Sequence, residues 1–211
     1  MLDILTPVLK SWPSKYCLEA NAIAIQVHGG YGYTREDPLE RLYRDNRLNP
    51  IHEGSEGIQS LDLLGRKVMM NNGEAFNYLS SQVEQTIAQA LENSETNTLG
   101  QALNDSWQCL QHTTHLLIAL AKKEGIAKVL SNSALYLDAF GHSVVAWLWV
   151  KQALIATEKL TKVTPIERDF YLGKKQAAQY FLRWELPKIE LACRLLDEQE
   201  QSCVEMDTNW F

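Results

Sequence analysis

The sequence predicts an all-α protein, and three observations support this prediction. Helical periodicity of three and four residues fills nearly every segment between the 11 glycines and 6 prolines of the 211-residue chain. Period-two alternation of the kind that indicates β-strands is absent from the sequence. Hydrophobic residues make up 45% of the chain, which is enough to build a substantial core. We therefore expect a helical bundle with a second, antiparallel helical bundle appended to it.

Turn signals define the first two helices. The first helix is expected over residues 14–28, because two glycines directly follow its last periodic residue. A loop rich in Gly and Tyr is expected over 29–36. The segment 37–40, Asp-Pro-Leu-Glu, then supplies an N-cap, a proline at the first helical position and an acid in the first turn. This pattern predicts a short second helix that ends near Asn46, before an Asn-Pro pair.

The next two helices are predicted to be amphipathic and to meet at a sharp turn. The third is expected from Ser55 to the Asn-Asn-Gly turn at 71–73, and the fourth over 74–92. The polar segment 93–98 is expected to be a loop. Apolar residues at spacings of three and four predict the buried faces, which comprise Ile58, Leu61, Leu64 and Val68 in the third helix and Phe76, Leu79, Val83, Ile87 and Leu91 in the fourth.

Three long helices are expected in the rest of the chain, over residues 99–123, 126–160 and 165–201. The middle one is apolar most of the way round near Trp147, which is typical of a helix at the centre of a bundle or against another subunit. Pro187 is expected to kink the last helix, because proline lacks the amide hydrogen and its ring clashes with the preceding turn.

Charge and composition exclude several classes of function. The chain carries 26 acidic and 20 basic residues, whereas nucleic-acid binding requires clustered Lys and Arg. No apolar stretch approaches the roughly 18 residues that a membrane span needs, and the N-terminus lacks the pattern of a signal peptide. The cysteines are widely spaced without a CxxC pair, which predicts reduced thiols and a cytoplasmic location. They are Cys17, Cys109, Cys193 and Cys203.

Three ordered motifs carry a resemblance to a known family. They are QVHGGYGY at 26–33, PLERLYRD at 38–45 and IHEGSEGIQ at 51–59. Together with their spacing, they make the segment from 16 to 67 resemble the C-terminal helical domain of acyl-CoA dehydrogenases. The segment after residue 73 is similar to the extra C-terminal domain of the larger branch of that family, which includes the 3-methylmercaptopropionyl-CoA dehydrogenases. This second similarity rests on helical layout and on the wording NRLNPIHEGS.

The resemblance also implies a domain division and an incomplete protein. Residues 1–72 correspond to part of the C-terminal helical domain, and residues 73–211 to an additional helical bundle. The family has an N-terminal helical domain and a middle β-domain before this region, and these hold most of the flavin and substrate cleft. We therefore expect a C-terminal fragment or a truncated gene product that is incomplete as an isolated chain. The alternative is a non-catalytic helical module for interaction or oligomerisation.

The resemblance implies a catalytic role for Glu53. Desaturation of an acyl-CoA thioester requires a base for the weakly acidic α-proton while hydride leaves the β carbon for flavin N5, and a carboxylate in a dry site can be that base. In the family, the backbone N–H of the same residue and the flavin ribityl 2′-hydroxyl polarise the thioester carbonyl. Gly54 lets backbone or substrate come close. The alternative is that Glu53 is a solvated loop acid near a helix N-terminus.

The resemblance further implies that Gln26, Gly29, Gly30 and Ser55 contact FAD. In the family, the Gln and two glycines approach the adenosine and pyrophosphate of a flavin held by a neighbouring subunit, and bare backbone N–H groups can meet phosphate oxygens. The alternative is a plain helix C-cap at the glycines and an N-cap at Ser55. Gly57 replaces a polar residue that is common in the family, which removes one flavin contact.

Partners and metals complete the predictions. The family implies an acyl-CoA substrate, an electron-accepting flavoprotein, and a homodimer or higher homo-oligomer. The apolar surface of the helix with Trp147 and Trp149 also favours self-association. His112 and His115 could share a helix face and ligate a metal, but no acidic or Cys partner has matching spacing. We expect two polar histidines at the helix surface or at an interface, and no metal site. FAD is expected only in the complete enzyme.

Overall fold

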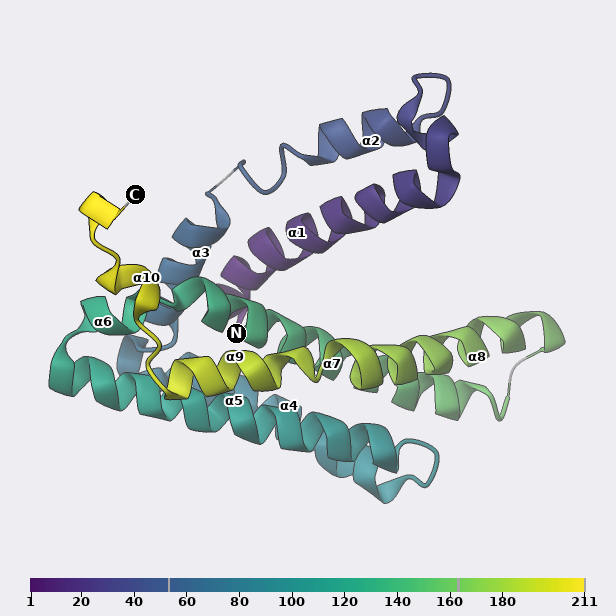
Figure 1. The fold of residues 1–211 in the computed structure, drawn as a ribbon. Helices are drawn as coiled ribbons and strands as arrows, with labels where there is room; N and C mark the ends of the chain where they lie inside the picture. Colours follow the sequence, from purple (N-terminus) through teal and green to yellow (C-terminus); the bar gives the residue numbers. More distant parts are fainter. Residues whose placement is uncertain (53, 163, 211) are drawn as a thin grey trace.

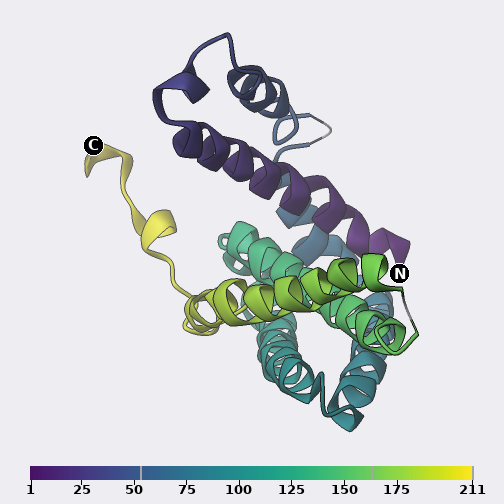
Figure 2. The same cartoon turned by 90° about the vertical axis from the view of Figure 1, so that its right-hand side faces the viewer.

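The computed structural model describes residues 1–52, 54–162 and 164–210, without the side chain of Ile166. Within these ranges the chain forms helices and turns and contains no β-strand, which confirms the all-α prediction. Figures 1 and 2 show a helical hairpin, formed by α1 and α2, that projects from a bundle of the helices that follow it.

Helix α1 spans Leu2–His28 and begins twelve residues earlier than the sequence predicted. Pro7 and Pro13 both lie inside it, although proline in a helix interior removes a backbone hydrogen bond. The expected boundary was wrong because tertiary packing outweighs this cost. Ile4 and Val8 are 0% and 4% exposed, so the first turns of α1 are part of the hydrophobic core.

The hairpin turns at η1, a 3-10 helix over Gly29–Tyr33, and returns through α2, Leu39–Asn46. The backbone of Gly32 packs against α1 so closely that a Cβ would lie 2.6 Å from the carbonyl oxygen of Ile25. Asp37 Oδ1 accepts a hydrogen bond of 3.0 Å from the Leu39 amide, but α2 begins one residue later than predicted, so Pro38 rather than Asp37 occupies the N-cap position.

Helix α3, Glu56–Asp62, continues into the π-helical turn η2, Leu63–Lys67. The predicted buried face is only half right, since Leu64 and Val68 are buried whereas Ile58 and Leu61 are 59% and 43% exposed. The Val68 amide donates to the Leu63 carbonyl across five residues, and this wider turn changes which positions face the core. The buried positions instead repeat every four residues, namely Gln59, Ser60, Leu63, Leu64, Lys67 and Val68.

The short 3-10 segment η3, Met70–Gly73, contains the predicted Asn-Asn-Gly turn, where all three residues have positive φ. Helix α4, Glu74–Glu92, and helix α5, Asn97–Glu124, follow as an antiparallel pair. The buried face of α4 is as predicted except at Leu91, which is 42% exposed because α4 ends there. The polar loop is shorter than predicted, since α5 begins at Asn97.

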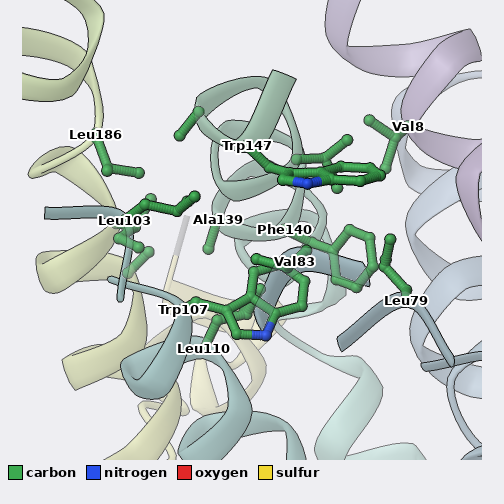
Figure 3. Close-up of a cluster of buried hydrophobic side chains, with 14 of the residues drawn as sticks. Val8, Leu79, Val83, Leu103, Trp107, Leu110, Ala139, Phe140, Trp147 and Leu186 are labelled. Carbon is green, nitrogen blue, oxygen red and sulfur yellow. The ribbon is translucent and has the colours of Figure 1, made fainter. Parts of the chain in front are cut away.

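Helix α6, Ile126–Leu130, and helix α7, Ser133–Lys159, replace the single helix predicted over 126–160. Ser131 and Asn132 form a turn between them, as expected for residues whose side chains compete for backbone hydrogen bonds. Helix α7 lies at the centre of the bundle and packs against α5, α8 and α9, which confirms one of the two predicted settings. Figure 3 shows the core around it, where Val8, Leu79, Phe140 and Trp147 come together from three helices.

The predicted last helix is divided into α8, Pro165–Tyr180, a π-helical turn η4, Phe181–Glu185, and α9, Lys188–Asp197. The break falls directly before Pro187, as predicted. The Leu186 amide bonds to the Phe181 carbonyl across five residues, which absorbs the irregularity that proline imposes. The segment then ends with α10, Ser202–Glu205, and η5, Thr208–Trp210, which lie beyond the bundle.

Candidate catalytic loop and cofactor pocket

The structure places the predicted site residues at two locations, separated by the length of α2. Gln26, Gly29 and Gly30 lie at the tip of the hairpin, whereas Gly54 and Ser55 lie at its base, where α3 begins (Figure 1). Glu53, the predicted base, lies outside the described residues. The geometry of the candidate site is therefore built from the residues on either side of position 53.

The segment before position 53 is fixed to α1 by a chain of asparagine side chains. Asn46 Nδ2 donates to Asn21 Oδ1 at 2.8 Å, and Asn49 Nδ2 donates to Asn46 Oδ1 at 2.6 Å. The His52 amide donates to the Leu48 carbonyl at 2.9 Å, so the turn that follows α2 is hydrogen-bonded up to residue 52. The approach to position 53 is thus held by α1 and by its own backbone.

A polar pocket of about 340 Å³ lies between α1 and this turn. Its polar side chains come from both elements, so it joins the hairpin to the segment that precedes position 53. The lining residues are Leu9, Lys10, Pro13, Ser14, Cys17, Asn46, Asn49 and His52. The sequence motifs alone give these residues no role, since their proximity depends on how α1 pairs with the turn after α2.

The segment after position 53 is fixed to α3. Gly54 has φ of +101°, and a Cβ there would lie 2.9 Å from Gln59 Nε2, so both conformation and space favour glycine. Ser55 occupies the N-cap position of α3, and its carbonyl accepts the first helical bond from Gln59 at 3.0 Å. Its hydroxyl makes no capping hydrogen bond within the described part of the chain. The N-cap alternative for Ser55 therefore applies to its backbone rather than to its side chain.

Lys15 joins α1 to both α3 and α7. Its Nζ donates to Glu56 Oε1 at 3.2 Å and to Asp138 Oδ2 at 2.6 Å. Burial alone would lower the pKa of Lys15, but the hydrogen bond and charge of Asp138, together with Glu56, more than offset this and raise the pKa above its ordinary value. Lys15 is therefore a charged ammonium shared by two carboxylates.

A buried histidine lies one turn further along α7. His142 is 3% exposed, and its Nδ1 lies 3.3 Å from Trp12 Nε1 and 2.9 Å from the Asp138 carbonyl oxygen, so it can accept from the first or donate to the second. Burial lowers the pKa of His142; Asp138 and Glu185 oppose this effect and Lys188 adds to it. The neutral ring thus packs α1 against α7.

The hairpin tip carries a second pocket, of about 640 Å³, between α1, η1 and α2. Tyr33 and Tyr43 present aromatic rings, and Arg35 and Arg44 present cations, with Arg44 3.4 Å from Glu40. This combination suits a ligand that has both an aromatic ring and phosphate groups. The second arginine and tyrosine lie in the PLERLYRD motif, one helical turn from Glu40, but the motif alone gave them no role.

The fold explains why glycine occupies position 29 at the hairpin tip, but not why it occupies position 30. Gly29 has φ of +60°, which favours glycine at this helix end. Gly30 has neither a positive φ nor any atom within 4 Å of the position that a Cβ would take. The described fold therefore gives no internal reason for glycine at position 30, and the space beside it is open.

The two predicted surface histidines behave as ordinary helix residues. His112 and His115 are exposed on α5, and the His115 ring packs edge-on against Phe76 with centroids 6.2 Å apart. Across residues 1–52, 54–162 and 164–210 there is no cluster of three or more His, Cys, Asp or Glu side chains that could hold a metal ion. None of the described helices is long and apolar enough to cross a membrane.

The described residues form a helical hairpin, with one pocket at its tip and a loop at its base, that shares a hydrophobic core with a bundle of helices. Residues 3–69 match the family model for the acyl-CoA dehydrogenase C-terminal domain, and residues 79–207 match the model described as acetyl-CoA dehydrogenase C-terminal like. The chain belongs to the acyl-CoA dehydrogenase family.

Two curated relatives and one solved structure illustrate the relationship. The broad-specificity linear acyl-CoA dehydrogenase FadE5 of Mycobacterium tuberculosis is 27% identical over 97% of this chain and 34% of its own length. The 3-methylmercaptopropionyl-CoA dehydrogenase of Ruegeria pomeroyi is 27% identical over 77% of this chain and 28% of its own length. An acyl-CoA dehydrogenase from Bacillus anthracis, crystallised with FAD, shares the fold with a TM-score of 0.68 at 19% identity, over 98% of this chain and 34% of that one. The chain thus spans about a third of the length of these proteins.

Proposed function

We propose that this chain forms the C-terminal portion of an FAD-dependent acyl-CoA dehydrogenase, which desaturates an acyl-CoA thioester between its α and β carbons. The observation that supports this most directly is the fixing of the chain on both sides of position 53. The Asn21–Asn46–Asn49 hydrogen bonds hold the preceding turn, and Gly54 packs against the first turn of α3. A general base must be held in place to act, so such anchoring suits a catalytic loop.

In this proposal Glu53 removes the α-proton of the thioester, and its backbone N–H donates a hydrogen bond to the thioester carbonyl oxygen. Gly54 would contact the substrate through its backbone, because the side on which a Cβ would point is filled by Gln59. The Ser55 hydroxyl, which makes no capping bond, is available to a bound cofactor. When bound, FAD would accept the hydride that leaves the β carbon.

The residues at the hairpin tip fit the adenosine and phosphate end of FAD. Tyr33 and Tyr43 offer stacking surfaces, and Arg35 offers a cation for phosphate. The open space beside Gly30 admits a ligand or a second subunit close to the backbone. Gln26 is exposed on the same end of α1 and would complete this group of contacts. The space beside Gly57 is also open, since no atom lies within 4 Å of the position that a Cβ would take. Because glycine has no side chain, this position offers FAD no side-chain contact.

We further propose that the chain does not retain FAD by itself. The hairpin tip is solvent-exposed, with Tyr31 77% and Tyr33 85% exposed, so a bound flavin would be covered on one side only. Pockets that bind cofactors tightly bury most of the ligand surface.

We also propose that the chain consists of two units, residues 1–72 and 73–211. This division is supported by two family models that lie on either side of it.

We also propose self-association, but through the hairpin rather than through the helix that contains Trp147 and Trp149. Trp147 is 4% exposed and Trp149 is half-buried, so α7 uses most of its apolar surface inside its own chain. The hairpin exposes more of its apolar side chains, since Ile23 and Val27 are 56% and 78% exposed, whereas Leu148 of α7 is 43% exposed. We propose that this hairpin surface contacts a second copy of the chain or the preceding domains of the same polypeptide.

Two further proposals concern the electron acceptor of the complete enzyme and the location of the protein in the cell. Reduced flavin must pass on two electrons before another turnover, so we propose an electron-accepting flavoprotein as the partner of the complete enzyme. A cytoplasmic location is supported by the four cysteines, all of which are free thiols.

The competing proposal is a non-catalytic helical interaction module, which the compact bundle favours. A titration of FAD into the purified chain, followed by the same measurement on the complete dehydrogenase, separates the two. The dehydrogenase proposal expects flavin absorbance and acyl-CoA-dependent dye reduction only in the complete protein. If the complete protein binds no flavin, or is not reduced by any acyl-CoA, the interaction module is the better account.

A further inference from the structure

One ion-pair network connects the two parts of the chain at the candidate catalytic loop. Lys15 lies on α1 and Glu56 is the first residue of α3, and both belong to the segment matched at 3–69. Asp138 lies on α7, within the segment matched at 79–207. The Lys15 ammonium therefore connects the appended bundle to the residue that directly follows the Gly54–Ser55 pair.

The contacts around this network show that it fixes a helix start. Lys15 Nζ lies 2.6 Å from Asp138 Oδ2 and 3.2 Å from Glu56 Oε1, and the three side chains are about one-third exposed. Helices α1, α3 and α7 pack against one another here. A second hydrogen bond between α3 and α7 joins Ser60 Oγ and Ser133 Oγ at 3.0 Å and is buried, and the Ser60 hydroxyl also donates to the Gly57 carbonyl at 2.8 Å. Helix α3 is thus joined to α7 at two points, through Lys15 at Glu56 and directly at Ser60.

The charges explain why Asp138 matters to the loop. Glu56 and Asp138 are like charges that converge on a single ammonium, so Lys15 must be present for both to approach. Asp138 in turn holds Lys15 by the shorter of the two hydrogen bonds. Without the Asp138 charge, Lys15 loses its stronger partner and Glu56 loses a fixed counter-ion.

We propose that Asp138, acting through Lys15 and Glu56, positions the loop that leads into α3, so that the appended bundle sets the geometry of the candidate catalytic loop. Lys15 and Asp138 are positioning residues in this account. Their catalytic meaning rests on the proposed function, whereas their effect on the loop can be measured without it.

Hydrogen exchange on the 211-residue chain tests the positioning. In Asp138→Asn, which keeps the shape of the side chain, the amides of 54–62 should exchange roughly 2- to 5-fold faster than in the wild type, as expected for loss of one partly exposed ion pair. The single variant Lys15→Arg keeps the charge and can bond both carboxylates, so its exchange over 54–62 should stay close to that of the wild type.

A matched control is the ion pair between Lys175 and Glu95, 2.9 Å apart, which joins α8 to the turn between α4 and α5. Glu95→Gln removes one carboxylate charge from an interhelical pair far along the chain and should leave exchange over 54–62 unchanged. Equal exchange of these amides in Asp138→Asn and Glu95→Gln would overturn the proposal. If Asp138→Asn fails to fold, Glu56→Gln tests the same link from the loop side.

The complete dehydrogenase supplies a second measurement. Asp138→Asn should lower the rate of flavin reduction at saturating acyl-CoA by roughly 2- to 10-fold, with acyl-CoA affinity unchanged, because a misplaced base slows the chemical step rather than binding. If exchange over 54–62 does not change, the positioning is refuted even when the enzyme is active. If exchange changes but Glu53→Gln has no effect on flavin reduction, the proposed function fails and the positioning of the loop stands.

Discussion

Replacing Ile4 by alanine tests whether α1 is part of the bundle core. Ile4 is 0% exposed and lies in the first turn of α1, which the sequence pattern did not assign to a helix. Removing three carbons loses about 2.4 kcal/mol of transfer free energy at ~0.8 kcal/mol each, and the remaining cavity brings the expected loss to about 3 kcal/mol. In a chain of this size such a loss lowers Tm by roughly 6–12 °C.

The assay is urea and thermal unfolding, followed by far-UV circular dichroism and by tryptophan fluorescence. Leu2→Ala is the control, because Leu2 lies in the same turn of α1 but is 80% exposed, and it should change the free energy of unfolding by no more than about 0.5 kcal/mol. Equal midpoints for the two variants would refute the assignment of α1 to the core. Two resolved transitions, with only one shifted by Ile4→Ala, would refute the shared core between the two matched segments.

Two other predictions concern pH and the loop. Burial lowers the pKa of His142, so below the ordinary His pKa of about 6.5 the unfolded chain takes up a proton more readily than the folded chain, and stability falls as pH drops. The decrease in urea midpoint between about pH 7.5 and pH 5.5 should therefore be smaller in His142→Gln than in the wild type. An identical decrease in the two proteins would contradict this. Gly54→Ala should destabilise the chain by about 1–3 kcal/mol, because φ is +101° and a Cβ would lie 2.9 Å from Gln59 Nε2. Gly57→Ala, a helical site with no atom near the new Cβ, should instead stabilise it by about 0.5–1 kcal/mol; the same sign of change in both variants would show that the geometry at Gly54 is not special.

The sequence was sufficient to predict helices wherever periodicity and turn chemistry agreed. The bounds of α4 were predicted correctly because an Asn-Asn-Gly turn precedes it and a polar segment follows. The start of α1 was not, because Pro7 and Pro13 are local signals against a helix and only the burial of Ile4 in a distant core overrides them. Local propensity carries no information about such long-range packing.

The π-helical turns were a second obstacle. A period of 3.6 residues assigned Ile58 and Leu61 to the buried face, but the wider turn at Leu63–Lys67 alters the repeat to four. No residue in this segment signals a π-helical turn in the way that Pro187 signals a break. The register of α3 therefore required the structure.

The candidate site was predictable as a set of motifs but not as an arrangement in space. The motifs identify Gly54 and Ser55 beside position 53, and the structure shows what holds them. Lys15 and Asp138, which connect this loop to α7, are 123 residues apart, and neither belongs to a recognised motif. Their pairing depends on the packing of α1 against α7, which no local pattern encodes.

The most direct test of the central claim is flavin reduction by acyl-CoA in the complete dehydrogenase, comparing the wild type with Glu53→Gln. The substitution keeps the shape and hydrogen-bonding capacity of the side chain but removes the base. Acyl-CoA binding should survive, while flavin reduction should slow by at least about 10²-fold. In the isolated chain the same substitution should alter nothing measurable. Retained flavin reduction in the complete Glu53→Gln protein would contradict the account, as would dye reduction by the isolated wild-type chain that Glu53→Gln abolishes.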